Sequence, residues 1–207
     1  MSPSPAAMTF AQHGWADRAG SIRQLVGTAS PAQTAVVAPD LGWWRTWWRL
    51  PPLIDAVEAQ AAACLARYPQ CPMRIVGHSM GGLLWLELLA RHPEWWPRVR
   101  SLVLLASPVG GAALARAIDP LGLGLGMAKD LGVNRRAIAE RIAAAMPTLV
   151  VAGNWRYGSD GTILLRATRV QGAQFISLAL PHPQLRSHPA LVPVLQRFWA
   201  RTEPHLA

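Results

Sequence analysis

A serine lies at the centre of a Gly-x-Ser-x-Gly pattern formed by Gly77, Ser79 and Gly81. An apolar, strand-like run leads into this pattern, and a helix-like run follows it. A serine on so sharp a turn takes strained backbone angles, and side chains two residues before and after it would collide, so glycines are needed there. The pattern predicts that Ser79 is a nucleophile. A tight turn that contains serine by coincidence is the alternative.

A nucleophilic serine needs a base, and the base needs an acid that orients it. In a doubly wound sheet, such residues come from loops at the carboxyl ends of later strands. Asp160 follows the apolar run 148–153, and His182 follows the run 173–180. We therefore predict Asp160 as the acid and His182 as the base.

Other acidic residues and histidines compete for these roles. Asp119 and Asp130 lie in a glycine-rich stretch, away from a strand end. His188 stands where the last helix should begin, which favours a surface or capping role. His78, inside the serine turn, is expected to pack. Asp160 itself has a second interpretation, because an Asp-Gly pair also serves as a turn.

Short apolar runs alternate with longer helix-like segments along the chain. The strand candidates are 8–14, 34–40, 73–79, 99–107, 146–154 and 173–180, and the helix candidates are 53–69, 81–93, 135–146 and 189–201. This alternation predicts an α/β fold with a mostly parallel sheet of about six strands and helices on both faces. We expect one domain over 1–207, with a short cap-like insertion at about 109–146.

The composition narrows the class of protein. The chain has 207 residues, of which 51% are hydrophobic and 15% charged, so it can form a core. Its net charge is +9, but no basic run or RNA-binding motif indicates nucleic acid as a partner. No Cys/His cluster has metal-ligand spacing, and we expect neither a metal nor an organic cofactor. We find no leader pattern and no membrane span, and expect a cytoplasmic protein with Cys64 and Cys71 as free thiols.

Together these features resemble the α/β-hydrolase superfamily. Nucleophile, acid and histidine follow in that order, "HGWAD" precedes them, and "GHSMGG", "SPVGG" and "SDGT" have counterparts in short bacterial lipase- and esterase-like members. The resemblance implies a serine hydrolase that cleaves carboxylic esters with an apolar acyl or lipid portion. It also implies that the backbone N–H of Trp15 completes an oxyanion hole, to which the serine turn contributes the N–H of Met80. Little chain precedes the first strand, so we expect a minimal, lightly covered site.

Two other functions remain open. A thioesterase, an acyltransferase or another enzyme on the same scaffold would use the same residues. A binding or regulatory protein could keep the three residues as a relict.

Four tryptophans gather directly after the run 34–40, in "DLGWWRTWWRLPP". One interpretation is that Trp43, Trp44, Trp47 and Trp48 are buried against the next helix. The other is an interfacial patch, in which their indole rings sit at headgroup depth beside Arg45 and Arg49. The second interpretation would make the protein peripheral to a membrane.

Overall fold

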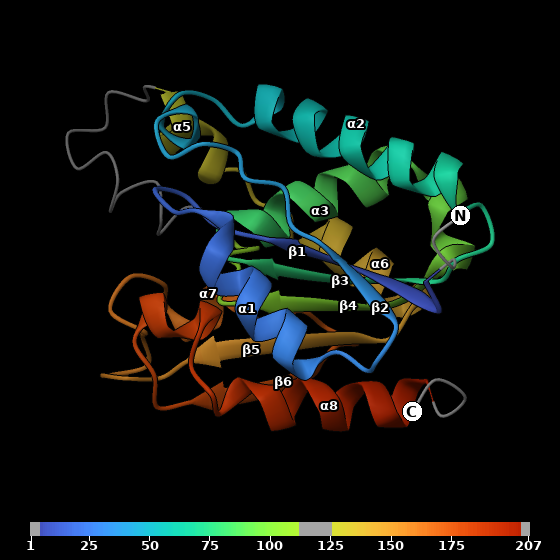
Figure 1. Cartoon of the computed structure of the whole chain (residues 1–207). Helices are drawn as coiled ribbons and strands as arrows, with labels where there is room; N and C mark the ends of the chain where they lie inside the picture. The colour runs from blue at the N-terminus through green and yellow to red at the C-terminus, as the bar shows by residue number, and fades with distance from the viewer. Residues whose placement is uncertain (1–4, 112–125, 204–207) are drawn as a thin grey trace.

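The computed structural model describes residues 5–111 and 126–203 (Figure 1). Six strands form one sheet in the order β2-β1-β3-β4-β5-β6, and every neighbouring pair is parallel. The strands are β1 (Ala7–Gln12), β2 (Thr34–Val37), β3 (Met73–His78), β4 (Val99–Leu105), β5 (Thr148–Gly153) and β6 (Gln174–Leu178). The predicted six-stranded parallel sheet is therefore confirmed.

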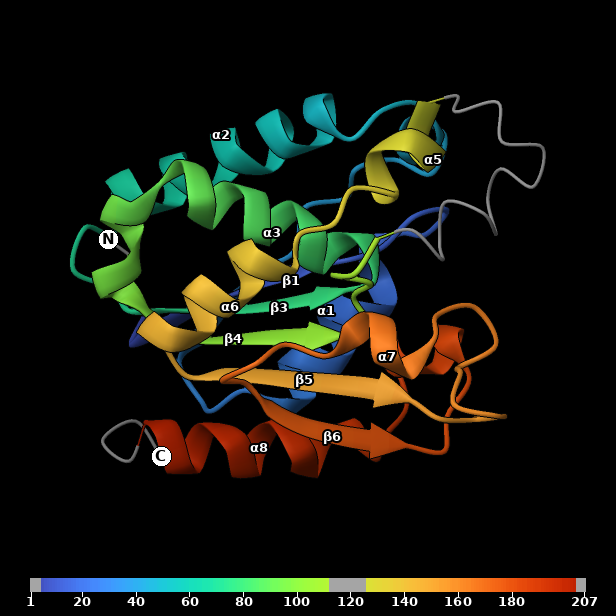
Figure 2. The same ribbon diagram turned by 180° about the vertical axis from the view of Figure 1, so that it is seen from behind.

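Helices cover both faces of this sheet. They are α1 (Ala19–Ala29), α2 (Pro51–Arg67), α3 (Met80–Arg91), α5 (Gly126–Leu131), α6 (Arg136–Ala145), α7 (Leu165–Thr168) and α8 (Leu191–Thr202). Short 3-10 turns are η1 (Arg45–Trp47), η2 (Pro93–Arg98) and η3 (His182–Arg186). Figures 1 and 2 show α2, α3 and α6 on one face, with α1 and α8 on the other. None of the described helices has the length and apolar character needed to cross a membrane.

The core is divided by the sheet into two apolar layers. Within β3, Ile75 belongs to the layer under α2 and α3, whereas Val76 belongs to the layer under α1 and α8. Val150 and Val151 of β5 divide in the same way. Successive side chains of a strand point to opposite faces, so a strand covered on both sides is apolar at consecutive positions. This is why the strands appear as continuous apolar runs in the sequence.

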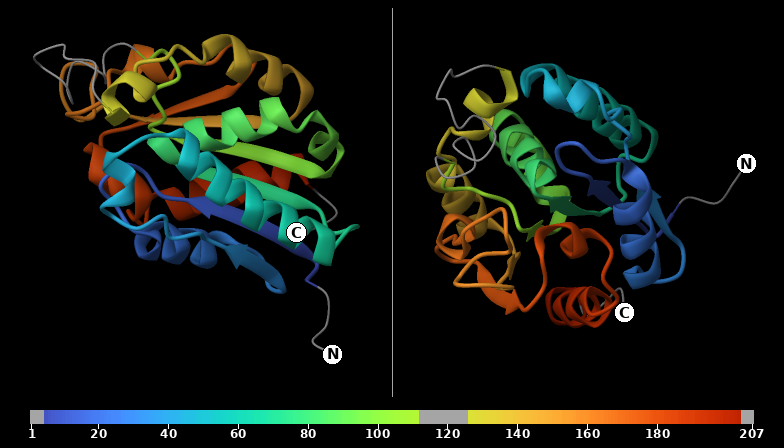
Figure 3. Two further views of the ribbon diagram at one scale, coloured as in Figure 1. Left: turned by 90° about the horizontal axis from the view of Figure 1, so that it is seen from above. Right: turned by 90° about the vertical axis from the view of Figure 1, so that its left-hand side faces the viewer.

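The carboxyl ends of all six strands meet at one edge, which faces the viewer in the right-hand panel of Figure 3. The turns that follow β1, β3, β5 and β6 all reach this edge, and they carry the residues to which the sequence assigns chemistry. The parallel arrangement therefore gathers segments that are far apart in the chain.

The predicted insertion at 109–146 is only partly described, because residues 112–125 lie outside the described ranges. In its later part, α6 packs beside α3 over the sheet (Figure 2), and α5 lies against η1. The role of this insertion as a cap stays a prediction.

Candidate active site

Ser79 stands at the turn between β3 and α3. Its φ is 54° and its ψ is −122°. Such angles cost a residue with a side chain on the order of 1–3 kcal/mol, and they persist only where the surroundings enforce them. Here the backbone N–H of Ser79 donates to the Leu105 carbonyl at the end of β4 over 2.8 Å, which holds the turn against the sheet.

Two glycines leave room for backbone on either side of Ser79. A Cβ at Gly77 would lie 2.5 Å from backbone atoms of Gly82, and one at Gly81 would lie 2.3 Å from the carbonyl oxygen of Gln12. Real Cβ atoms do not come so close to other atoms. The predicted reason for these glycines is confirmed, and the Gly81 contact shows that the turn also packs against the end of β1.

The side chains of Ser79, His182 and Asp160 form one chain of hydrogen bonds. Oγ of Ser79 lies 3.1 Å from Nε2 of His182, and Nδ1 of His182 lies 2.7 Å from Oδ2 of Asp160. An ionised carboxylate can only accept, so His182 donates its Nδ1–H to Asp160. Its Nε2 is then the acceptor for the Ser79 hydroxyl, which is the arrangement required to remove a proton from a serine.

The carboxylate of Asp160 is buried, and both of its oxygens are occupied. Its side chain is 1% exposed. Oδ1 accepts the backbone N–H groups of Thr162 and Ile163 over 2.8 and 2.6 Å, which leaves Oδ2 for His182. The N–H of His182 also donates to the backbone carbonyl of Asp160 over 2.9 Å. Asp160 therefore organises its own turn and is also bonded to the imidazole, so the turn interpretation does not compete with its predicted role as the acid, which stays a prediction.

The competing candidates have other partners. Asp130 accepts two hydrogen bonds from the guanidinium of Arg49 and one from the backbone N–H of Leu50. Nδ1 of His188 accepts a backbone N–H at the beginning of α8 over 3.2 Å, in keeping with a capping role. Asp119 lies outside the described residues.

His78, beside the predicted nucleophile, is buried and holds the loop of the predicted base. Its Nε2 lies 3.2 Å from the backbone carbonyl oxygen of His182, so Nε2–H must be the donor. Burial lowers the pKa of His78 well below its usual value, and the neighbouring His182 lowers it further. A neutral ring also places no positive charge next to His182. Packing was the expectation for His78; this hydrogen bond has no signature in the sequence.

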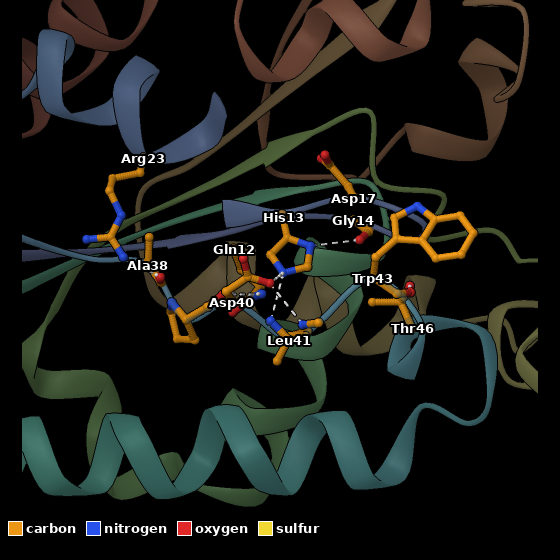
Figure 4. Close-up of polar contacts among 12 residues, drawn as sticks. Gln12, His13, Gly14, Asp17, Arg23, Ala38, Asp40, Leu41, Trp43 and Thr46 are labelled. Atoms are coloured by element: carbon orange, nitrogen blue, oxygen red, sulfur yellow. Dashed lines mark hydrogen bonds and ion pairs between the residues drawn. The ribbon is translucent and has the colours of Figure 1, made fainter. Parts of the chain in front are cut away.

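His13 fixes the backbone of the loop that follows β1. Figure 4 shows its ring between the Gly14 carbonyl and the backbone N–H of Leu41, which donates to Nε2 over 3.0 Å. Nδ1 must then carry the proton and donate to the Gly14 oxygen over 2.9 Å. Burial lowers the pKa of His13, which agrees with a neutral ring. In a trans peptide the C=O and N–H point in opposite directions, so the N–H of Trp15 faces away from His13.

The loop carrying Trp15 lies directly over Ser79, because a Cβ at Gly14 would be 3.0 Å from Cβ of Ser79. Met80 is the first residue of α3, and N–H groups in the first turn of a helix have no intrahelical acceptor. The assignment of Trp15 and Met80 as oxyanion donors stays a prediction, to which these positions add support.

Two contacts that hold this loop have no local signature in the sequence. The N–H of Ala16 donates to Oγ1 of the buried Thr46 over 3.0 Å, and Thr46 in turn donates to the Trp43 carbonyl over 2.6 Å. Asp17 and Arg186 approach to 3.1 Å, which brings the loop after β1 against η3. Each contact joins segments that are distant in the chain.

The tryptophan segment divides between the two interpretations. Trp44 and Trp48 are 79% and 76% exposed, Trp47 is 44% exposed, and Trp43 is partly buried. The burial interpretation is therefore wrong for Trp44, Trp47 and Trp48. Arg49 is bound to Asp130, which leaves Arg45 as the cation of the segment without an ion pair to a described residue.

The described residues hold no group of His, Cys, Asp and Glu suited to a metal ion. Cys64 and Cys71 are free thiols.

The chain resembles known hydrolases in sequence and in fold. Residues 3–195 match the profile of the family described as serine aminopeptidase, S33. Lipase LipV of Mycobacterium tuberculosis is 33% identical over 122 residues, which make up 58% of this chain and 45% of that protein. The match thus spans less than half of that lipase.

Two solved structures extend the likeness over almost the whole chain. Est1E from Butyrivibrio proteoclasticus, with ferulic acid bound, has a TM-score of 0.71 at 13% sequence identity. The superposition covers 97% of this chain and 91% of the Est1E chain. The propeptide form of the lipase BlEst2 from Bacillus licheniformis has a TM-score of 0.69 at 15% sequence identity. The superposition covers 94% of this chain and 51% of the BlEst2 chain. These likenesses confirm the predicted α/β-hydrolase fold. By its sequence profile and its sheet, the chain belongs to the serine aminopeptidase S33 family of α/β-hydrolases.

Proposed function

We propose that the protein is a serine hydrolase that cleaves carboxylic esters through an acyl-enzyme, with Ser79 as nucleophile, His182 as base and Asp160 as orienting acid. The observation that carries this proposal is the unbroken chain of hydrogen bonds from Ser79 Oγ through His182 to Asp160, at 3.1 and 2.7 Å. The membership of a hydrolase family supports it.

In the first step, Oγ of Ser79 attacks the ester carbonyl while its proton moves to Nε2 of His182. Asp160 stabilises the resulting imidazolium through Nδ1–H. The negative charge that develops on the carbonyl oxygen is bound by the N–H groups of Trp15 and Met80. The protonated His182 then gives its proton to the leaving alcohol, which leaves the acyl group on Ser79.

In the second step, water replaces the alcohol. His182 removes a proton from this water as it attacks the acyl carbonyl, and the same N–H groups hold the oxyanion. Collapse of the intermediate returns the proton to Ser79 and releases the carboxylic acid. Both steps use only groups of the protein, the ester and water.

An ester with an apolar acyl or lipid portion is the substrate class that we propose. The lipase to which the chain is similar, and the esterase and lipase structures that it resembles, support this choice.

Hydrolysis of matched substrates tests this function. We expect turnover of p-nitrophenyl esters of graded acyl length, and a loss of kcat on the order of 10⁶ in Ser79→Ala. Ser177→Ala, which removes an exposed hydroxyl from β6, is the matched control and should keep full activity. Matched thioesters and aminoacyl amides measure the competing reactions. Preferential cleavage of either would change the assigned reaction, and activity of a few per cent in Ser79→Ala would refute the mechanism.

A further inference from the structure

Three exposed indole rings and one cation lie together at the rim of the candidate site. Trp44, Trp47 and Trp48 belong to η1 and its flanks, and Arg45 lies among them. We call these four residues the indole surface. A groove of about 510 Å³ opens beside it, lined by Trp47, Trp48, Arg49 and Gly126. Large exposed apolar patches on a protein usually mark a place where something binds.

The protein holds this surface in place from beneath. Thr46, between the exposed rings, is fully buried and bonds both Ala16 and the Trp43 carbonyl. On the far side of the segment, Asp130 fixes Arg49 through two hydrogen bonds. The indole rings are thus presented outward by a segment that is anchored at both ends.

Aromatic contacts connect the indole surface to the loop over the nucleophile. The ring centroids of Trp47 and Trp15 are 4.2 Å apart, and those of Trp43 and Trp47 are 5.3 Å apart. Trp44 continues this series outward, 4.5 Å from Trp43. A molecule that met the exposed rings would therefore be next to the loop that carries the Trp15 N–H.

The chemistry of these residues fits an anionic lipid surface. An indole has an apolar body and one N–H, so it favours the headgroup depth of a bilayer over either water or hydrocarbon. Arg45, which has no ion pair to a described residue, lies beside the rings, and it and the net charge of +9 add attraction to anionic headgroups. We propose that the indole surface docks the protein on anionic lipid bilayers, with the site facing ester substrates that reside in them. The claim about substrates rests on the proposed function; the docking itself does not.

Co-sedimentation with vesicles of ether-linked phosphatidylcholine and phosphatidylglycerol tests the docking, because ether lipids offer no ester to cleave. We expect wild type to bind, and Trp44→Ala/Trp48→Ala to lose on the order of tenfold or more in partitioning. Trp47 is left in place because it contacts Trp15. Trp95→Ala, which removes an indole from η2 at the opposite end of the sheet, is the control and should bind like wild type.

A second pair of variants measures how much charge contributes to binding of the vesicles. Arg45→Gln should weaken binding about fivefold, whereas Arg100→Gln, which removes an exposed cation from β4, should not. Added salt should weaken binding by wild type but should not abolish it, because indole insertion is not screened.

Several results would overturn the docking surface. They are no binding by wild type, equal binding by wild type and the double variant, or equal losses in the double variant and Trp95→Ala. Circular dichroism and hydrolysis of a soluble ester report separately on folding and on the proposed function. If the double variant does not fold, wild-type fluorescence decides: vesicles should shift the indole emission to the blue and protect it from an aqueous quencher, and an unchanged spectrum refutes the proposal.

Discussion

At the scale of single residues, the reactivity proposed for Ser79 depends on which protons its neighbours hold. The backbone N–H groups of Thr162 and Ile163 hold Oδ1 of Asp160, which leaves Oδ2 facing Nδ1–H of His182. The backbone thus orients the carboxylate, and the imidazole must donate its Nδ1–H because an ionised carboxylate can only accept. His78 holds the backbone of the same residue, because its Nε2–H donates to the His182 carbonyl.

Replacing the acid by its amide tests this chain of dependence. In Asp160→Asn, the amide can present N–H₂ to His182 and stabilise the tautomer that cannot accept the Ser79 proton. We expect kcat on a soluble ester to fall on the order of 10⁴-fold. Asp130→Asn, which alters the carboxylate bound to Arg49, is the matched control and should keep most of the activity. Equal losses in the two variants would argue against Asp160 as the orienting acid.

At the scale of elements, the site is made by close approach of the β3–α3 turn to the end of β1. Gly81 permits that approach, since its missing Cβ leaves room for the carbonyls of Gln12 and His13. The same contact places the loop after β1 over Ser79. A change at Gly81 should therefore affect both the packing of β1 and the geometry of the candidate site.

Two glycine-to-alanine variants distinguish a glycine that is needed for close packing from one that only adds conformational freedom to the unfolded chain. Gly81→Ala forces backbone segments apart, and it should lower the free energy of unfolding by roughly 1–3 kcal/mol and abolish most activity. Gly27→Ala in α1 meets no atom within 4 Å, so it should be neutral or stabilise by about 0.4–1 kcal/mol. Urea unfolding monitored by circular dichroism measures both. A Gly81→Ala protein as stable and active as wild type would refute this account of the turn.

Much of the arrangement of the elements was predictable from the sequence, because functional residues of a parallel sheet lie in the loops at the carboxyl ends of its strands. The run before Ser79, and those before Asp160 and His182, placed three residues at one edge of the sheet. Helix α1 was not predicted, although Ile22, Leu25, Val26 and Ala29 have helical spacing and are buried. Gly20 and Gly27 lower the helix propensity of that stretch and obscure the pattern.

What sequence reasoning could not supply are contacts between distant segments. The Thr46 hydroxyl reaches Ala16, 30 residues away, and His13 accepts a bond from Leu41. Neither contact follows a local rule of spacing or propensity, since each depends on how loops meet after the sheet has formed. The exposure of Trp44 and Trp48 was equally open, because aromatic residues suit both a core and an interface.

At the scale of the whole molecule, a buried ion pair joins the last helix to the sheet. Nε of Arg74 in β3 donates to both carboxylate oxygens of Glu203 over 2.9 and 3.0 Å, and each side chain is 2% exposed. Ser101 of β4 also donates to Glu203, and the Arg74 guanidinium lies 4.8 Å from the Trp199 ring centroid. Arg74 is near the amino end of its strand, so this cluster is remote from Ser79.

Removing one partner of this ion pair should lower the free energy of unfolding strongly, whereas replacing both partners by apolar residues should not. Glu203→Ala leaves a buried cation without its partner and should lower the free energy of unfolding by about 3–5 kcal/mol. The double variant Arg74→Met/Glu203→Leu removes both charges and keeps similar volume, so its stability should be close to that of wild type. Urea unfolding compares the two. If Glu203→Ala were as stable as the double variant, Arg74 would not need Glu203 as its partner, and this interpretation of the ion pair would be wrong.

The dependence of stability on pH should follow the buried histidines. Burial lowers the pKa of His13 and of His78, so below about pH 6.5 the unfolded chain binds protons that the folded protein does not. The free energy of unfolding should therefore fall as the pH decreases through this range. His78→Gln should reduce that fall.

His92 should act in the opposite direction. Its burial lowers its pKa, but hydrogen bonds with Glu94 and Glu58 outweigh that effect and raise it, so protonated His92 adds stability below about pH 6.5. His92→Gln should steepen the loss of stability on acidification. Urea unfolding of both variants between neutral and mildly acidic pH checks the two signs, and identical slopes would contradict them.

The central claim, that His182 and Asp160 make Ser79 a nucleophile, is tested most directly by reaction with a fluorophosphonate. Attack by Oγ forms a serine–phosphorus bond and expels fluoride, so the product is a stable adduct that mass spectrometry can locate. We expect one label per chain, on the peptide containing Ser79, with labelling abolished in Ser79→Ala and strongly slowed in His182→Ala. A folded protein that stays unlabelled, or that carries the label on another residue, would contradict the account.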